Sequence, residues 1–451
     1  MTPAHGISFG EAAKLWLKVG LLGFCGPAGQ IALMHRLLVE EKRWIGEARF
    51  LHALNYCMLL PGPEAQQLAT YVGWLLHRTA GGLVAGLLFV LPGALVILAL
   101  SALYAGFQDV PLVAALFYGI KAAVLAVVVE ALLRIAKRAL KNGVMFAIAV
   151  AAFVAIFALG IDFPLIVLAA GLIGWAGAKL LPGQFLPPQP KPGAPPEDAA
   201  ADRALAAGLL PHTKPNGRRA AVTLIAWLAI WLAPLAALAW AFGGESVFAQ
   251  LGLFFSKMAV VTFGGAYAVL AYVAQEAVSG FGWLAPGEML DGLGLAETTP
   301  GPLILVLEFV GFLAAYRHGG FDPLLAGALG AGVTLWATFA PCFLWIFLGG
   351  PYVEALRGNK PLAGALSAIT AAVVGVIANL ALWFALHALF REVEPRKFLG
   401  LRLELPNLLT LDAAALALAA AALIATLRFK LGMIPVLVGC ALAGAAWKLW
   451  M

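Results

Sequence analysis

Long uncharged, apolar runs dominate the pattern of hydrophobic and polar positions along this chain. No charged residue falls within 79–108, 323–353 or 361–390. Each run exceeds the roughly 20 apolar residues that cross the hydrocarbon core of a bilayer. Because every backbone polar group in hydrocarbon needs an internal partner, these runs predict helices. The alternating short segments that are typical of a membrane β-barrel are not found.

The apolar segments predict an all-α, polytopic membrane protein of about 13 transmembrane helices, interrupted in places. Six spans fall in the first half of the chain, near 9–34, 50–77, 81–106, 111–133, 143–160 and 163–181. Six fall in the second half, near 248–274, 288–315, 323–349, 361–389, 410–427 and 432–450. One unmatched span, near 220–242, lies between the two sets.

One segment breaks the apolar pattern. Residues 182–219 hold nine prolines, several charges and few large apolar side chains. This composition predicts a disordered linker. We therefore divide the chain into a first repeat (1–181), the linker (182–219), a connecting transmembrane helix (220–242) and a second repeat (243–451).

The two halves repeat at a constant offset of 239 residues. The matches at this offset are Lys18 with Lys257, Phe24 with Phe263, Trp44 with Trp283, and Pro61-Gly62-Pro63 with Pro300-Gly301-Pro302. Further along, the offset grows by about ten, so that Pro92 aligns with Pro341 and Pro111 with Pro361. An identical triplet in register with three other identities indicates an internal duplication.

The unmatched helix decides how the halves are oriented. Six crossings return the chain to its starting side, and one more makes the second half begin on the opposite side. The halves are then inverted repeats, as in many secondary transporters. An odd number of crossings in either half would reverse this argument. Lysine and arginine are more numerous in the loops that this topology assigns to the cytoplasm, which favours a cytoplasmic N-terminus.

Composition supports the membrane class and excludes others. Hydrophobic residues make up 63% of the chain and charged residues 12%, against about half and a quarter in soluble domains. The net charge of +6 fits cytoplasmic loops rather than nucleic-acid binding. The four cysteines are scattered, which fits neither a disulfide framework nor a zinc site. We expect the lipid bilayer as a partner, with no nucleic acid, cofactor or metal; residues 1–10 resemble no cleavable signal.

Helix breakers recur at matched places in both halves. Gly23–Pro27 interrupts the first span and Thr262–Gly265 its partner, while the two Pro-Gly-Pro triplets interrupt the second spans. Proline ends one helix and suits the first turn of the next. A fresh helix start offers unpaired N–H groups and a positive dipole end, which together attract anions. The candidate substrate-binding residues are Gly26, Pro27, Ala28, Pro61, Gly62, Pro63, Glu64, Gln66, Gly264, Gly265, Thr298, Thr299, Pro300, Gly301 and Pro302. The alternative is that each break is a simple kink.

Charged residues inside the apolar spans add further candidates. Lys18 and Lys257 lie just before the first breaks, where a symmetric pair of ammonium groups could neutralise a dianion; snorkelling to the interface is the alternative.

Among the intramembrane acids, the candidates for proton coupling are Glu64, Glu130 and Glu308; Asp291 and Glu297 also lie in these spans. Glu64 could instead cap its helix. Thr298 and Thr299 could instead bond to their own helix.

Four segments resemble signatures of the chromate ion transporter family, in its long, two-domain form. They are Phe24–Ala28, Leu60–Ala69, Thr262–Gly265 and Phe339–Trp345, and the resemblance covers nearly the whole chain outside the linker. Cys25 stands where the family pattern has the first glycine of Phe-Gly-Gly-Pro. The resemblance implies export of chromate across the inner membrane, chromate resistance, and sulfate as a related or competing oxyanion.

The resemblance also implies secondary transport, and the sequence has no Gly-x-x-x-x-Gly-Lys-Ser/Thr loop to bind ATP. Two rival functions stay open: uptake of sulfate or another oxyanion, and an anion channel. An enzyme is not expected, because no metal or nucleophile constellation is found. A homodimer is also left open.

Overall fold

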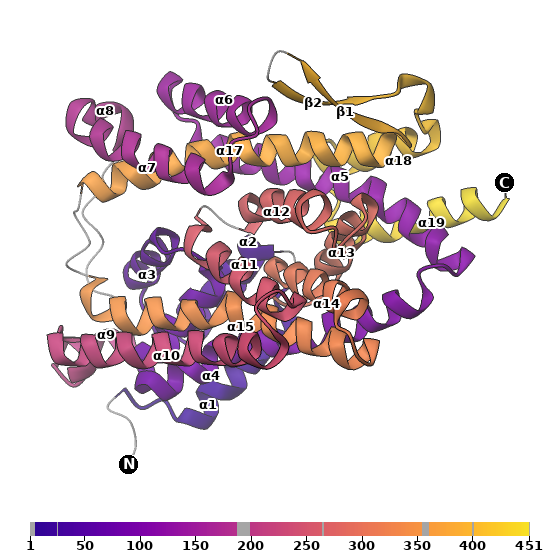
Figure 1. Ribbon diagram of the computed structural model, residues 1–451. Helices are drawn as coiled ribbons and strands as arrows, with labels where there is room; N and C mark the ends of the chain where they lie inside the picture. The colour runs from indigo at the N-terminus through magenta and orange to yellow at the C-terminus, as the bar shows by residue number, and fades with distance from the viewer. Residues whose placement is uncertain are drawn as a thin grey trace. The chain divides into compact units, whose positions relative to one another are not determined.

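The computed structural model describes residues 5–24, 26–186, 199–263, 266–353, 360–398 and 401–450. These residues are almost entirely helical (Figure 1). They divide into two compact units, and each unit draws segments from both halves of the sequence. Unit 1 comprises Met1–Ser101, Pro188–Gly265 and Thr299–Gly358, and unit 2 comprises Ala102–Pro187, Ala266–Thr298 and Asn359–Met451. The compact units are therefore not the sequence repeats.

Unit 1 contains the elements on both sides of the helix breaks. Its elements are α1 (Phe9–Leu22), α2 (Gly26–His35), the π-helix η1 (Arg36–Glu41), α3 (Glu47–Leu59), most of α4 (Glu64–Phe107), α9 (Ala200–Ala206), η2 (Pro211–Thr213), α10 (Gly217–Phe242), α11 (Val247–Val261), η4 (Leu303–Leu305), α14 (Val306–His318), α15 (Pro323–Gly349) and η5 (Gly350–Tyr352). Helix α4 is bent at His77 and Arg78, where Arg78 adopts φ +54°. It therefore consists of two helices joined end to end.

Unit 2 contains the remaining helices and one hairpin. Its elements are α5 (Pro111–Ala139), α6 (Gly143–Phe157), α7 (Phe163–Leu180), α8 (Pro182–Phe185), α12 (Ala266–Gln275), the π-helix η3 (Glu276–Gly280), α13 (Pro286–Thr298), α17 (Lys360–Leu389), β1 (Val393–Phe398), β2 (Leu401–Pro406), η6 (Leu408–Thr410), α18 (Ala413–Leu427) and α19 (Met433–Trp450). Strands β1 and β2 pair antiparallel, with Val393 opposite Pro406. The sequence prediction missed this hairpin, although Leu401–Leu405 alternates apolar and charged residues as a strand does.

The element boundaries confirm the duplication. Helix α13 begins and ends 239 residues after α3, and each is preceded by a π-helix whose last residue, Glu41 or Gly280, is also 239 residues from its counterpart. Helices α18 and α19 begin 270 residues after α6 and α7. The offset is 250 at Pro111 and Pro361, and it grows from there to 270 because the β-hairpin is inserted between α17 and α18, where the first half has no counterpart.

Matched helices also pack reciprocally in unit 2. Helix α7 packs along α17 and α19 along α5, while α6 contacts α17 and α18 contacts α5. Since α5 corresponds to α17 and α7 to α19, each repeat supplies the same surface to the other. Small residues permit the close approach, because a Cβ at Gly174 would lie 2.3 Å from the Gly364 carbonyl oxygen.

Seven of the described helices are long and apolar enough to cross a membrane: α4, α5, α7, α10, α15 with η5, α17 and α19. Helices α6, α11 and α18 are shorter and apolar. Helix α10 runs alongside α15 (Figure 1), yet only 6% of its most apolar stretch is buried. Ile225 and Leu253 are 69% and 75% exposed, as expected for side chains that lipid rather than water covers.

The predicted linker, 182–219, differs from the structure at both ends, since its first residues form α8 (Pro182–Phe185). Residues 199–219 are described and carry α9 and η2, because the run Ala199–Ala207 is rich in helix-forming alanine. The Asp202 carboxylate accepts a hydrogen bond from Gly46 N (2.8 Å) at the start of α3 and pairs with Arg49. Residues 187–198 lie outside the described part of the chain.

Candidate functional site

The predicted helix breaks are present in unit 1. Helix α1 ends at Leu22 and α2 begins at Gly26; α3 ends at Leu59 and α4 begins at Glu64, directly after the first triplet. In the second half, α11 ends at Val261 and α13 at Thr298, and the second triplet leads into η4 and α14. The broken-helix prediction is therefore confirmed at all four places.

The triplets and the breaks are joined crosswise. Gly62 of the first triplet donates its N–H to the Thr262 carbonyl at the second-half break, at 2.8 Å. Gly301 of the second triplet donates its N–H to the Gly23 carbonyl at the first-half break, at 3.0 Å. Gly62 and Gly301 are equivalent at the 239-residue offset, and so are Gly23 and Thr262. The two bonds therefore join equivalent donors to equivalent acceptors, as expected when a pseudo-two-fold axis relates the repeats.

The prolines within long helices complete this arrangement. A Cβ at Gly62 would lie 3.0 Å from the Sγ atom of Cys342, which follows Pro341 in α15. A Cβ at Gly301 would lie 3.2 Å from the Cα atom of Gly93, which follows Pro92 in α4. Gly62 and Gly301 have φ +113° and +102°, a conformation that glycine alone adopts readily. Both positions therefore require glycine for conformation and for space.

A small cavity lies at this crossing. Its lining includes Gly62, Pro63, Thr262, Ile304 and Thr338, which come from both halves of the sequence. Its volume of about 10 Å³ admits about one water molecule. Pro63 and Pro302 are both buried rather than exposed to lipid.

The first helix turns after the breaks are the predicted anion donors. The first turn of a helix presents its N–H groups toward the helix start, and the first turn of α4 contains Glu64, Ala65 and Gln66. Gln66 is fully buried, and its Nε2 donates to Thr70 Oγ1 at 3.1 Å. Helix α2 places Gly26, Pro27 and Ala28 in the equivalent first turn. Gly264, Gly265 and Cys25 lie outside the described residues.

The charged candidates lie in different environments. Lys18 on α1 and Lys257 on α11 are both exposed in unit 1, each one turn or so before its break. Glu308 on α14 is 1% exposed, and its Oε2 has no hydrogen-bond partner. Glu130 belongs to unit 2 and pairs with Arg134 on the same helix. The structure therefore brings Glu130 into a different unit from the triplets.

The threonines before the second triplet also differ from each other. Thr298 Oγ1 donates to the Gly294 and Leu295 carbonyls of its own helix, at 3.2 and 2.9 Å. This is the alternative that the sequence left open. Thr299 is buried.

Two further glutamines support the helix breaks. Gln30 is fully buried on α2, and its Nε2 donates to the Gly23 carbonyl at 3.1 Å, so it supports the first-half break. Gln67 Nε2 donates to the Pro61 carbonyl at 2.7 Å and supports the first triplet. Each is a glutamine in an apolar span shortly after a break, a pattern that indicates a polar contact, and the structure shows that the contact of each is with the backbone of the break itself.

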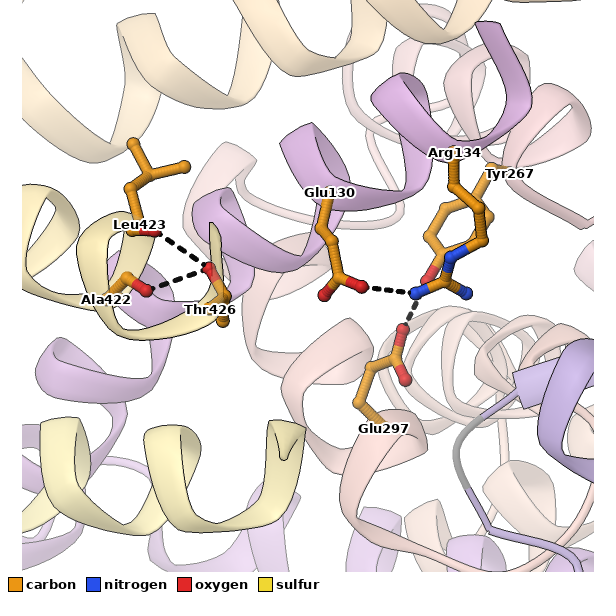
Figure 2. Close-up of polar contacts among 7 residues, drawn as sticks. All are labelled: Glu130, Arg134, Tyr267, Glu297, Ala422, Leu423 and Thr426. Atoms are coloured by element: carbon orange, nitrogen blue, oxygen red, sulfur yellow. Dashed lines mark hydrogen bonds and ion pairs between the residues drawn. The ribbon is translucent and has the colours of Figure 1, made fainter. Parts of the chain in front are cut away.

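A second polar cluster lies in unit 2 on α5, α12 and α13. Tyr267 Oη donates to the buried Glu297 carboxylate at 2.6 Å. Figure 2 shows the Arg134 guanidinium and the Tyr267 hydroxyl between the Glu130 and Glu297 carboxylates. The same view shows Thr426 of α18, whose Oγ1 donates to the Ala422 and Leu423 carbonyls of its own helix.

A larger cavity lies elsewhere in unit 1. It has a volume of about 570 Å³ and is lined by His35, Glu40, Arg43 and Glu47, among others. His35 pairs with both glutamates. With two carboxylates in its wall, this cavity is poorly suited to a dianion.

Comparisons with known proteins identify the family of this chain. The chain matches the chromate transporter family over residues 10–175 and 249–445. A chromate transport protein of Pseudomonas aeruginosa is 36% identical over 377 residues, which cover 82% of this chain and 80% of that protein.

A chromate transport protein of Cupriavidus metallidurans is 28% identical over 368 residues, covering 81% of this chain and 80% of that protein. A probable chromate transport protein of Synechococcus elongatus is 28% identical over 381 residues, covering 84% of each. No solved structure matches the chain. With a duplicated helical architecture, crosswise-joined helix breaks and family matches in both halves, this chain is a multi-pass membrane protein that belongs to the chromate transporter family.

Proposed function

We propose that this chain is a secondary transporter that exports chromate across the inner membrane and so confers chromate resistance. The observation that carries the proposal is the crosswise pair of bonds, Gly62 N–H to Thr262 and Gly301 N–H to Gly23. They hold interrupted helices of both repeats together in unit 1. Secondary transporters commonly bind substrate at such discontinuous helices, where N-termini point at anionic groups.

The proposed substrate site uses backbone donors first. Gly62 and Gly301 use their N–H groups to join the repeats, so their role is to hold the triplets in place. In this proposal the substrate binds to the first helix turns after Pro27, Pro63 and Pro302, because their N–H groups and positive dipole ends favour a dianion. Glu64 in the first turn of α4 would repel the substrate unless it is protonated.

Lys18 and Lys257 supply the positive charge in this proposal. They are equivalent in the duplication and lie just before the two first-span breaks. Two ammonium groups balance the two charges of chromate. Thr299, Pro300 and Pro302 form the matching wall in the second half.

The direction of transport follows from charge. Moving one charge across 100 mV changes the free energy by about 2.3 kcal/mol. For a dianion the figure is about 4.6 kcal/mol, which favours exit from a cell that is negative inside. Uptake of the same anion would work against this potential.

The test is tracer chromate uptake into inverted membrane vesicles, where export appears as accumulation. Vesicles that contain the protein should take up chromate faster than vesicles from cells without it. The rate should saturate and respond to a proton gradient. Uptake found only in right-side-out vesicles, blocked by excess sulfate, would instead identify a sulfate uptake carrier. Flux that never saturates would identify an anion channel.

A further inference from the structure

A buried ion pair in unit 2 takes no part in the substrate site described above. Asp291 of α13 has 3% of its side chain exposed, and its Oδ2 lies 3.2 Å from Lys121 Nζ of α5. Tyr104 Oη, near the end of α4, donates to the same oxygen at 2.7 Å. Asp291 Oδ1 is buried and has no hydrogen-bond partner. A carboxylate held this way is costly to bury, which makes it a candidate functional group.

The duplication shows that the fold does not need this ion pair. Helix α3 has the same boundaries as α13 at the 239-residue offset, yet it carries His52 where α13 carries Asp291. Alignment of Pro111 with Pro361 likewise places Ala371 opposite Lys121. The first repeat forms the same helices without the pair. Structural necessity therefore does not explain it.

We propose that Asp291 is the proton-binding site through which substrate movement is coupled to a proton gradient. This inference rests on the proposed function as a secondary transporter. A proton from the water on one side binds an Asp291 oxygen, the ion pair with Lys121 breaks, and the pair changes from neutral to a charge of +1. Release of the proton to the other side restores the pair. Nothing else is consumed.

The partners of Asp291 select a proton over a metal cation. A cation needs oxygen atoms that offer lone pairs. Here both neighbours of Oδ2 donate hydrogen instead, Tyr104 through its hydroxyl and Lys121 through its ammonium group. Lys121 is 32% exposed whereas Asp291 is nearly inaccessible, so the lysine side chain leads from the carboxylate toward the surface of the chain.

Other charged groups on the neighbouring elements are already engaged or lie apart. Glu130 and Arg134 form a partly exposed pair along α5, and Glu297 is held by Tyr267 of α12. Helices α17 and α19 also pack against α13. Their charged or titratable groups are Lys360 at the start of α17, His387 against the Trp383 ring, and Lys448 over the Tyr118 ring. Glu288 on α13 itself accepts a hydrogen bond from Ala285 N.

The experiment compares coupled with uncoupled transport in proteoliposomes at a clamped membrane potential. Exchange of labelled for unlabelled chromate needs no gradient. Accumulation under a pH difference of one unit should rise up to about tenfold for one proton per cycle. We expect Asp291→Asn to abolish that rise while exchange stays within about threefold of wild type. Asp291→Glu should keep the rise with a shifted pH profile.

Two matched controls sharpen the result. Asp109→Asn makes the same change at an exposed residue before α5 and should leave both assays unchanged. Glu297→Gln should keep the gradient response. The proposal is overturned if Asp291→Asn still shows the tenfold rise, or if Glu297→Gln loses it in its place.

A readout that needs no chromate separates this inference from the proposed function. Infrared difference spectra of the purified protein between high and low pH should contain a protonated-carboxyl band that Asp291→Asn lacks. If the wild type carries no chromate, the proposed function fails, yet the band still decides whether Asp291 binds a proton. If the band is unchanged in Asp291→Asn, the proton site is refuted whatever is transported.

Discussion

The two units hold polar groups in opposite ways. In unit 1 the two repeats contribute equally, through backbone N–H and carbonyl groups at Gly62, Thr262, Gly301 and Gly23. In unit 2 acidic side chains gather on α13, whereas the equivalent helix α3 carries Arg49, His52 and Met58 at the positions of Glu288, Asp291 and Glu297. The backbone contacts of unit 1 therefore recur in both repeats, whereas these acids of unit 2 occur in one repeat only. This contrast predicts paired effects for mutations in unit 1 and unpaired effects in unit 2.

The largest expected effect is at the two glycines of the triplets. Gly62→Ala and Gly301→Ala each force a Cβ into a positive-φ conformation against close neighbours, at a cost of about 1–3 kcal/mol. We expect each to lower chromate flux at least tenfold, by similar factors, as measured in inverted vesicles. Gly332→Ala is the control, because a Cβ there meets nothing within 4 Å. Unequal losses would mean that the two crosswise bonds are not functionally equivalent.

The next largest effect is expected at the two matched lysines, Lys18 and Lys257. Lys18→Gln and Lys257→Gln should each reduce transport about tenfold, since each removes one of two charges that balance the dianion. Membrane insertion should persist, because an uncharged residue is cheaper to place in lipid. Lys14→Gln, one turn earlier on α1 and also exposed, should behave as wild type. Normal flux in the double variant Lys18→Gln/Lys257→Gln would remove both lysines from the site.

A smaller effect is expected where the segment 199–219 contacts α3. Asp202→Ala removes the acceptor of Gly46 N–H and the partner of Arg49. Loss of this cap should cost about 1 kcal/mol of stability, seen as a lower Tm in detergent. Flux should change less than about twofold, because Asp202 lies outside the proposed substrate site. A large loss of flux at unchanged Tm would contradict this structural role.

The smallest effect compares matched helix caps in unit 2. Asn142 caps α6 and Asp412 caps α18 at the 270-residue offset. Burial by itself would raise the pKa of Asp412, but hydrogen bonds from Ala415 N and Tyr118 Oη stabilise the carboxylate and lower the pKa below its ordinary 3.8. A lowered pKa contributes stability above the ordinary value, which is lost as pH falls through the folded-state value.

Asp412→Asn should therefore cost little at neutral pH, about 0.5 kcal/mol, because Asn caps nearly as well as Asp. Below about pH 4, the free energy of unfolding of this variant should fall less with decreasing pH than that of the wild type. An acid-unfolding curve in detergent measures this difference. If the curve below about pH 4 is the same in the variant and the wild type, other carboxylates cause the loss of stability in acid. Asn142→Ala should cost about 1 kcal/mol with no such pH dependence.

The sequence was sufficient for the framework of unit 1. Prolines and glycines at matched offsets located the four helix breaks, because these residues act on their own backbone whatever surrounds them. The crosswise contacts were not predicted. An offset shows which residues of the two repeats are equivalent. It does not show whether a residue contacts its own equivalent or a different position in the other repeat. Gly62 and Gly301 were therefore predicted as substrate-binding residues, and the sequence did not indicate that their N–H groups bond to Thr262 and Gly23.

The polar cluster of unit 2 was harder to predict for a related reason. Asp291 stood out as an acid in an apolar span, but its partners Lys121 and Tyr104 come from distant helices. Only packing decides such pairs. The helix α9 was missed because averaging over 182–219 let the prolines outweigh the alanine run that begins at Ala199.

The crosswise bonds have a consequence for biosynthesis. Thr262 follows Gly62 by 200 residues, which a ribosome needs roughly 10–40 s to add at about 5–20 residues per second. An N–H group without an acceptor costs several kcal/mol in hydrocarbon. During that interval the Gly62 N–H group must bond to another acceptor, such as water or the insertion machinery. The first repeat therefore cannot reach its final structure alone. The crosswise bonds at the helix breaks form only after the second repeat has been synthesised.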